Sequence, residues 1–446
     1  YTKVGLGIQA VAQDRQTALL MGIRPNRIYA ITFGISAALA GLAGVLLAPL
    51  FSIYPSVGWR PFLLAFIVVM IVSPQSRNDV VLDADDVHHP VPVHDRRSVS
   101  QPPGPQGGRR GMSGESIRAG IDRTLGQLSG DVRSAKGMFM LALLLIAAVS
   151  PLLVSRHWVG IIIQIAIYAL VVLSWNFIAG YFGLFTFAHA ALFGVGGYGT
   201  AIVAAEYGVP PMLAPLLGGL AAGLLALPVI VPVLRLADDY VAMVTLAYAE
   251  ILHRAAIILD GITGGPTGYT GIGSMFGGGQ LVFFYFVLAV VAGLALLQYG
   301  LLVSRFGLIA RAIRESEDAA QMLGNNTIRF KTIGFVIGSS IAGIAGGLQA
   351  YYIGIVSPPM MALTQMIDFL AMAVVGGLGV MTGPVAGTVI VHGSTEALRQ
   401  IGDIRLLLWG ILLIAVILYF PKGFMGDDRF WDRIEALLDR FRGGSS

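Results

Sequence analysis

The sequence predicts an all-α fold, a polytopic bundle of transmembrane helices, and three observations support it. Of 446 residues, 56% are hydrophobic and only 12% are charged, whereas soluble domains carry about 25% charged residues. Apolar runs long enough to cross a bilayer, which takes about 20 helical residues, recur along the chain. Arg and Lys collect between these runs. Lipid is therefore the expected solvent for much of this chain.

The apolar runs predict roughly twelve spans, about ten in a main domain and two near the N-terminus. Basic residues mark cytoplasmic loops. With twelve spans, the basic stretches before residue 28, at 304–331 and after 420 fall on the same side. Both termini are therefore expected in the cytoplasm, with the chain in a bacterial cytoplasmic membrane. The predicted spans are 28–51, 60–72, 138–154, 158–178, 184–206, 211–234, 240–260, 281–302, 332–354, 366–380, 384–398 and 404–420.

Two segments lie outside this pattern. Residues 73–137 are rich in Asp, Arg, Pro and Gly and cannot bury enough apolar area to offset chain entropy. We interpret them as a disordered cytoplasmic linker with one weak helix near 115–128. Three histidines among aspartates in this linker could suggest a metal site, but we favour a solvated segment and expect no metal (His88, His89, His94). The main domain is then 138–426, followed by a cytoplasmic tail, 427–446.

The chain contains an internal repeat. Residues 5–46 align without a gap with residues 307–348, at an offset of 302, and 14 of the 42 positions are identical. The pairs include Gly22 with Gly324 and Gly44 with Gly346. Internal repeats are common in transporters. The correspondence continues to Val69 and then stops, where the first copy runs into the linker.

The loop 304–331 has helical periodicity. Apolar side chains fall on one face (Ile309, Ile313, Ala320 and Leu323), with the arginines elsewhere. We predict one short amphipathic helix, too charged to span, that stops at Gly324. It could dock a partner protein, or it could rest on the lipid surface.

Polar residues within the spans are candidates for a substrate pathway. Glu250 lies near the middle of its span, where a charge costs about 2.5–3.5 kcal/mol, so it should face a pathway or pair with His253 or Arg254. For His189 a hydrogen bond between helices is favoured over contact with a ligand. The glycine runs 194–199 and 343–347 should permit close helix packing. The candidate pathway residues are Asn176, His189, Glu250, Thr263, Gly264 and Gly265.

The sequence lacks the motifs that mark several classes of enzyme and ATPase. The only lysines are Lys3, Lys136, Lys331 and Lys422, and none belongs to a P-loop. Neither His-Glu-x-x-His nor Gly-x-Ser-x-Gly occurs, so we expect a transport subunit, not an enzyme, with no cofactor of its own. An ion-coupled secondary transporter is the main alternative and would show charged relays and no docking loop.

The loop and several other motifs resemble the ABC permeases for branched-chain amino acids. The 304–331 loop resembles their EAA-type ATPase-coupling loop, and 10–22 is its counterpart in the first copy. Asn176, Gly180-Tyr181, Gly183 and Phe187–Ala190 resemble a further signature, and Tyr419–Gly423 resembles the family's end. The residues that match the two loops are Arg311, Arg314, Glu315, Glu317, Asp318, Ala319, Ala320 and Gly324, and then Ala10, Asp14, Ala18 and Gly22.

The resemblance implies a division of the chain and a set of partners. Residues 138–426 resemble a complete M-type subunit of the Liv system, and 1–72 resemble only the C-terminal part of its H-type sister. We expect residues 70–111 to result from a frameshift or gene joining. The implied partners are ABC ATPase subunits carrying ATP and Mg, a sister permease and a substrate-binding protein, with no nucleic acid. The implied substrates are branched-chain or related hydrophobic amino acids; urea or short amides are the alternative.

Overall fold

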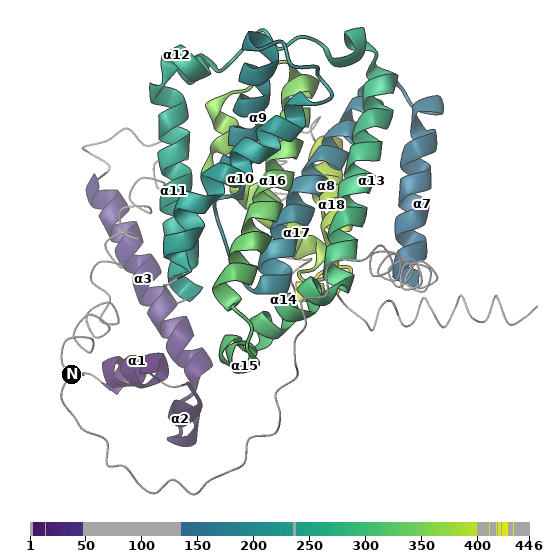
Figure 1. Ribbon diagram of the computed structural model, residues 1–446. Helices are drawn as coiled ribbons and strands as arrows, with labels where there is room; N and C mark the ends of the chain where they lie inside the picture. Colours follow the sequence, from purple (N-terminus) through teal and green to yellow (C-terminus); the bar gives the residue numbers. More distant parts are fainter. Residues whose placement is uncertain are drawn as a thin grey trace, which may run out of the picture. The chain divides into compact units, whose positions relative to one another are not determined.

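The structure, a computed structural model, describes residues 3–13, 15–47, 135–234, 238–398 and several positions between 410 and 431. The chain forms two compact units, 1–107 and 108–446 (Figure 1). In the described residues every element is helical, apart from an isolated bridge between Tyr269 and Val356. The all-α prediction is therefore confirmed there. The predicted span 60–72 lies outside the described residues, as do nearly all of the linker, the span 404–420 and the tail.

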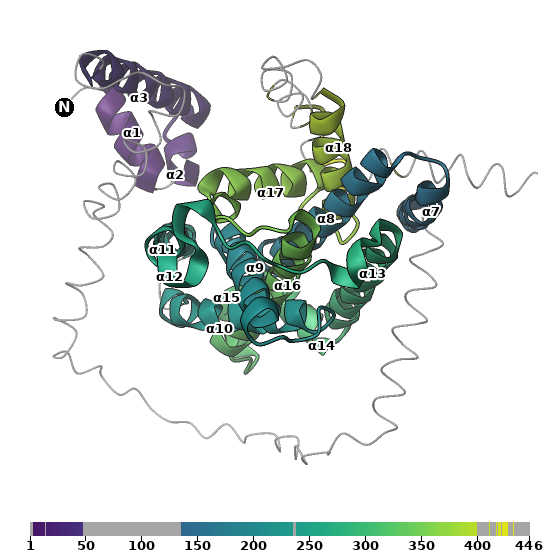
Figure 2. The ribbon, with the colours of Figure 1, turned by 90° about the horizontal axis from the view of Figure 1, so that it is seen from above.

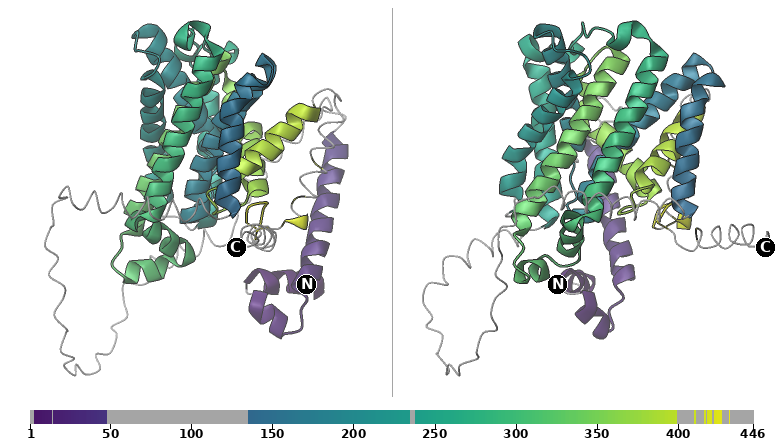
Figure 3. Two further views of the ribbon diagram at one scale, coloured as in Figure 1. Left: turned by 90° about the vertical axis from the view of Figure 1, so that its right-hand side faces the viewer. Right: turned by 45° about the vertical axis from the view of Figure 1, so that its right-hand side comes forward.

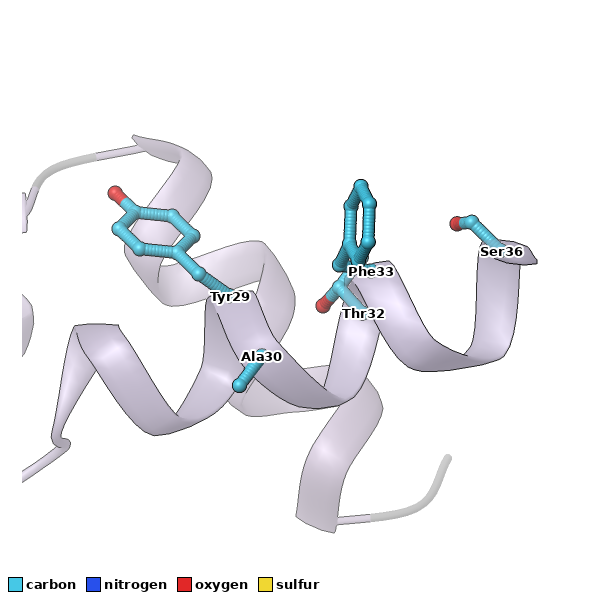
Figure 4. Close-up of a pocket in the computed structure, with 5 residues that line it drawn as sticks. All are labelled: Tyr29, Ala30, Thr32, Phe33 and Ser36. Atoms are coloured by element: carbon cyan, nitrogen blue, oxygen red, sulfur yellow. The ribbon is translucent and has the colours of Figure 1, made fainter. Parts of the chain in front are cut away.

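The N-terminal unit consists of two short helices and one long helix. The long helix spans about 35 Å at 1.5 Å per residue, and none of its most apolar stretch is buried. Figure 4 shows the side chains of Tyr29, Phe33 and Ser36 on one side of it, where they line a pocket. The three helices are α1 (Lys3–Gln13), α2 (Arg15–Leu20) and α3 (Pro25–Leu47).

The main unit is a bundle whose long helices run between two ends. Small helices gather at one end, and α14 and α15 lie at the other (Figure 1). Its helices are α7 (Ala135–Val149), η1 (Ser150–Leu152), α8 (Arg156–Phe182), α9 (His189–Glu206), α10 (Ala214–Val233), α11 (Asp238–Ile258), α12 (Asp260–Thr263), η2 (Gly265–Thr267), η3 (Met275–Gly278), α13 (Gln280–Val303), α14 (Arg305–Glu315), α15 (Glu317–Met322), α16 (Thr327–Ile353), η4 (Pro358–Met361), α17 (Leu363–Gly376) and α18 (Gly383–Ala397).

Six helices of the described residues are long and apolar enough to cross a membrane, so this is a multi-pass membrane protein. The predicted count of about ten spans in the main domain is not confirmed. The predicted spans 366–380 and 384–398 correspond in length to α17, with 14 residues, and α18, with 15. Each helix is only about 21–23 Å long, against a hydrocarbon core of about 30 Å, so neither counts as a full span. The six candidates are Pro25–Val45, Arg156–Phe182, Ala214–Val233, Tyr240–Ile258, Gln280–Val303 and Thr327–Ile353.

Two other boundaries also differ from prediction. The predicted span 184–206 becomes helical only at His189, because Gly183 takes a left-handed conformation (φ 75°) that ends α8. Residues 184–188 are not helical, and Leu184, Thr186 and Ala188 among them are buried within the protein, where non-helical backbone is tolerated. The last three residues of the predicted linker, 135–137, belong to α7, which stands at the edge of the bundle beside α13 (Figure 3).

The core of the bundle is a close packing of α9, α10 and α16, with α16 in the middle (Figure 2). A Cβ at Gly346 would overlap the carbonyl oxygen of Phe193, and one at Gly343 would overlap Ala222. Backbone contact this close requires glycine. The prediction that the glycine runs permit close helix packing is therefore confirmed. α16 packs against α8, α9 and α10.

Candidate functional site

The predicted coupling loop forms two helices instead of one. Ser316 leaves the helical region (φ −161°, ψ 110°), and its side chain accepts a hydrogen bond from the backbone N–H of Ala319 at 3.3 Å. Serine at this position, followed by acidic residues, is a strong start signal for a new helix. Glu317 and Asp318 supply those acidic residues. The prediction of a stop at Gly324 is confirmed, since Gly324 has φ 82°.

Two arginines anchor α14 to the bundle. Arg314 Nη1 donates to the carbonyl oxygen of Gly180, at the end of α8, at 2.5 Å. Arg311 Nη2 donates to the carbonyl oxygen of Leu302 at 3.3 Å, and its guanidinium lies 5.8 Å from the centre of the Tyr181 ring. Both side chains are thus directed toward the bundle, so they position the loop.

Asn176 belongs to the same junction. Its Oδ1 accepts from the N–H of Gly379 at 2.9 Å, and its Nδ2 donates to the carbonyl oxygen of Val380 at 3.1 Å. One amide side chain therefore ties α8 to the turn between α17 and α18. Asn176 lies one helical turn before Gly180, to which Arg314 is bonded. The structure thus brings Asn176 together with the coupling loop, although the sequence had placed it in the substrate pathway.

The tip of the loop exposes large apolar side chains. Met322 is 88% exposed and Leu323 is 79% exposed, whereas Ala320 is buried. The exposed face of α15 also carries Asp318 and Ala319. We define the docking tip as Met322, Leu323 and Gly324. The prediction that Leu323 shares the apolar face of Ala320 is wrong, because the helix ends at Met322 and Leu323 is exposed. Sequence reasoning missed Met322; two large apolar residues directly before a helix-stopping glycine were the available signal.

The first copy of the repeat forms the same tip. Leu20 is 87% exposed and Met21 is 78% exposed, and the following Gly22 has φ 81°. Val11 and Ala18 are buried like their counterparts in the second copy. Among the residues predicted for this loop, Ala10 lies on α1 and is half-buried, and Asp14 falls outside the described residues.

His189 begins α9 deep inside the bundle. Its side chain is fully buried, and neither ring nitrogen hydrogen-bonds to any described residue; the predicted hydrogen bond between helices is not made. The ring instead packs edge-on against Phe335, with centroids 6.3 Å apart. The extended segment before it is fixed by Trp175, whose Nε1 donates to the carbonyl oxygen of Thr186 at 2.8 Å. The structure thereby places a short non-helical segment, 183–188, between α8 and α9.

Glu250 has both partners expected from the sequence. Arg254 Nε donates to Glu250 Oε1 at 2.6 Å, and His253 Nδ1 lies 3.5 Å from Oε2. All three side chains belong to α11, so the charge is compensated within one helix. This pairing accounts for Glu250 without a ligand.

The segment 263–265 lies at the opposite end of the bundle from the coupling loop. Thr263 Oγ1 donates to the carbonyl oxygens of Ala256 and Leu259, at 2.7 and 2.8 Å. Gly264 and Gly265 both have positive φ. Further along, Tyr269 and Val356 exchange two backbone hydrogen bonds that join this segment to the residues after α16. The glycine-rich segment is therefore an ordered cap on this end, and it holds Thr263, Gly264 and Gly265 far from Asn176.

Two further charged residues were missed as site candidates. Lys331 near the start of α16 is buried and pairs with Glu317 across the loop. Asp368 on α17 is exposed on the bundle, and an acidic residue in so apolar a helix was the signal that sequence reasoning passed over. Among the described residues there is no group of three metal-ligating side chains, and the three linker histidines lie outside them.

The fold and the anchored loop define a helical membrane protein with an exposed apolar tip at one end of the bundle. The chain matches the family model described as a branched-chain amino acid transport system permease component, over residues 1–74 and 158–419, and it belongs to this family. It is therefore a permease component of a transport system. Its relatives are transport subunits and not enzymes.

Two kinds of permease are similar to this chain. The high-affinity branched-chain amino acid transport system permease protein LivM of Salmonella typhimurium is 30% identical over 316 residues, covering 65% of this chain and 74% of the relative. LivM of Escherichia coli is 29% identical over the same shares. LivH of Salmonella typhimurium is 34% identical over 145 residues, covering 31% of this chain and 46% of the relative. No solved structure is significantly similar.

Proposed function

We propose that this chain is the membrane-spanning permease subunit of an ATP-driven importer for branched-chain or related hydrophobic amino acids. The observation that carries the proposal is the docking tip on an anchored loop. An exposed apolar pair is costly in water and typical of a protein contact. Arg314 bonds the loop to α8, and Asn176 on α8 bonds the turn between α17 and α18, so a force applied at the tip reaches both.

The partner proposed for this tip is an ABC ATPase that supplies ATP and Mg, on the cytoplasmic side. The resemblance of the loop to the EAA-type coupling loop supports this partner, and so do the printed names of the relatives, which are subunits of transport systems. A sister permease would complete the pathway, and a substrate-binding protein would meet the opposite end, where the segment around Thr263 lies. We therefore propose that the chain lies in the bacterial cytoplasmic membrane.

The proposed substrate pathway passes the start of α9. A helix N-terminus favours negative charge, and transporters place interrupted helices at their substrate sites. His189 and the first turn of α9 are buried, and no side chain caps this end. The carboxylate of an amino acid is the group that would suit it. Glu250 and the segment 263–265 remain candidates for residues along the path, while Asn176 is better suited to fixing the junction.

Capture of an ATPase tests this proposal. The full chain in lipid nanodiscs should capture the purified ABC ATPase encoded with it, and Met322→Asp should remove capture. The matched control is Leu308→Asp on the same loop, an exposed apolar residue outside the tip. Capture that persists in the Met322 variant, or is lost equally in the control, would contradict the docking assignment.

A further inference from the structure

A polar network fastens α15 to the start of α16. Lys331 Nζ donates to Glu317 Oε2 at 2.5 Å. Gln321 Nε2 donates to Thr327 Oγ1 at 3.0 Å, and the side chains of both also hydrogen-bond to Glu317. Four side chains, two from each helix, thus form a network centred on Glu317 beside the short connection at 323–326.

The burial of this network makes it stiff. The Lys331 side chain is 6% exposed and the Glu317 side chain is 32% exposed. Separating a largely buried ion pair is unfavourable, so the pair of Lys331 with Glu317 resists separation when the loop is displaced. Lys331 belongs to α16, which continues between α9 and α10 through the core. A displacement of α15 is therefore imposed on the central helix of the bundle.

The first copy of the repeat lacks every member of the network. At the offset of 302 residues, the positions of Glu317, Gln321, Thr327 and Lys331 are occupied by Arg15, Leu19, Pro25 and Tyr29. An arginine and a tyrosine at the positions of Glu317 and Lys331 cannot form an ion pair. The leucine and the proline at the positions of Gln321 and Thr327 have no side-chain hydrogen-bonding group. The apolar tip is nevertheless present in both copies. The exposed apolar tip therefore occurs in both copies of the repeat, whereas the polar network around Glu317 occurs only in the second copy.

We propose that Glu317 and Lys331 are positioning residues that transmit movement of the docked α14–α15 loop to α16, and that the α1–α2 loop docks an ATPase without such transmission to α3. This inference rests on the proposed function, because it assumes an ATPase at the tip. The residues that transmit the movement, Glu317 and Lys331, are thus different from the residues of the docking tip.

The experiment uses the full chain in proteoliposomes with its ATPase, sister permease and binding protein. Leucine uptake per ATP hydrolysed is measured for Glu317→Lys, Lys331→Glu and the double charge swap. Each single reversal should lower this ratio by about five-fold or more, with the ATPase still bound, and the swap should recover most of it. The matched control is Arg329→Glu, an exposed charge on the same turn of α16, which should leave the ratio unchanged.

A second variant covers the case in which Lys331→Glu fails to insert. Glu317→Gln keeps the size of the side chain and removes its charge, and it should lower the ratio by about two-fold or more. A wild-type ratio in Glu317→Gln, or a charge swap that stays as low as the single reversals while binding the ATPase normally, would overturn the inference. If the wild-type chain captures no ATPase at all, the proposed function fails instead.

Discussion

The two copies of the repeat form the same local structure in different surroundings. At the offset of 302 residues, α1 and α2 coincide with α14 and α15 at both ends, and α3 begins where α16 begins. Yet 78% of the most apolar stretch of α16 is buried, and none of that of α3 is. Local sequence therefore determines the helices, the turn and the exposed tip, whereas packing depends on the neighbouring helices.

The largest expected difference between the copies concerns their glycines. Gly346→Leu should prevent proper packing, because its Cβ would overlap the carbonyl oxygen of Phe193, and overpacking costs about 1–3 kcal/mol or more. Gly44→Leu, the matched change in the first copy, meets nothing within 4 Å and should stay within about 0.5 kcal/mol. Thermal unfolding in detergent measures both. Equal losses would mean that α3 is packed as tightly as α16.

The docking tips provide the next comparison. Changing Met322 and Leu323 together to Asp should weaken ATPase binding by about 2 kcal/mol or more, roughly thirty-fold, as for central apolar contacts. The same change at Leu20 and Met21 should weaken binding less, because the arginine anchors Arg311 and Arg314 are replaced by Gln9 and Ala12 in the first copy. Titration of ATPase onto nanodiscs measures both. An equal or larger loss from the first copy would reverse our ranking of the two loops.

The turn glycines should behave alike in both copies. Gly22 has φ 81° and Gly324 has φ 82°, and a Cβ in this region costs about 1–2 kcal/mol. Alanine at either position should accelerate hydrogen exchange in its own loop, with Gly261→Ala, at a glycine without positive φ, as control. Acceleration in only one of the two loops would show that the shared turn is not equally maintained.

The smallest expected effect is one of pH. Burial raises the pKa of Glu317. Hydrogen bonds from Lys331 and Thr327 lower it by more than burial raises it, so the net pKa lies below the ordinary value of 4.5. A group with a lowered pKa contributes stability above its unfolded pKa and loses it as pH falls through the folded pKa. Wild-type thermal stability should therefore fall below about pH 4.5 more steeply than that of Glu317→Gln. Parallel curves would show that the pair adds no stability.

Sequence reasoning predicted local structure better than contacts. The repeat, the stop at Gly324 and the pairing of Glu250 with Arg254 depend on residues near one another in the chain, and all three were correct. The junction of Asn176 with Gly379 and Val380 joins residues about 200 positions apart, so no periodicity could reveal it. The break at Ser316 was readable from its helix-start signal, but the amphipathic pattern concealed it.

Burial accounts for the other differences. His189 was expected to bond across helices, but the bundle surrounds it with apolar groups such as the Phe335 ring. The lengths of α17 and α18 were predicted closely, with a break between them where Gly377 and Gly379 take positive φ. Counting them as full spans was not supported, because helices of 14 and 15 residues are shorter than the hydrocarbon core.

Protection of one introduced cysteine tests the central claim most directly. The chain has no native cysteine, so Met322→Cys places a single thiol at the docking tip, and Leu308→Cys serves as the exposed control. We predict that adding the ATPase to nanodiscs slows thiol labelling at Met322→Cys by about ten-fold or more, as expected for a residue at the centre of an interface, and leaves the control unchanged. Labelling of Met322→Cys at the same rate with and without bound ATPase would contradict the account.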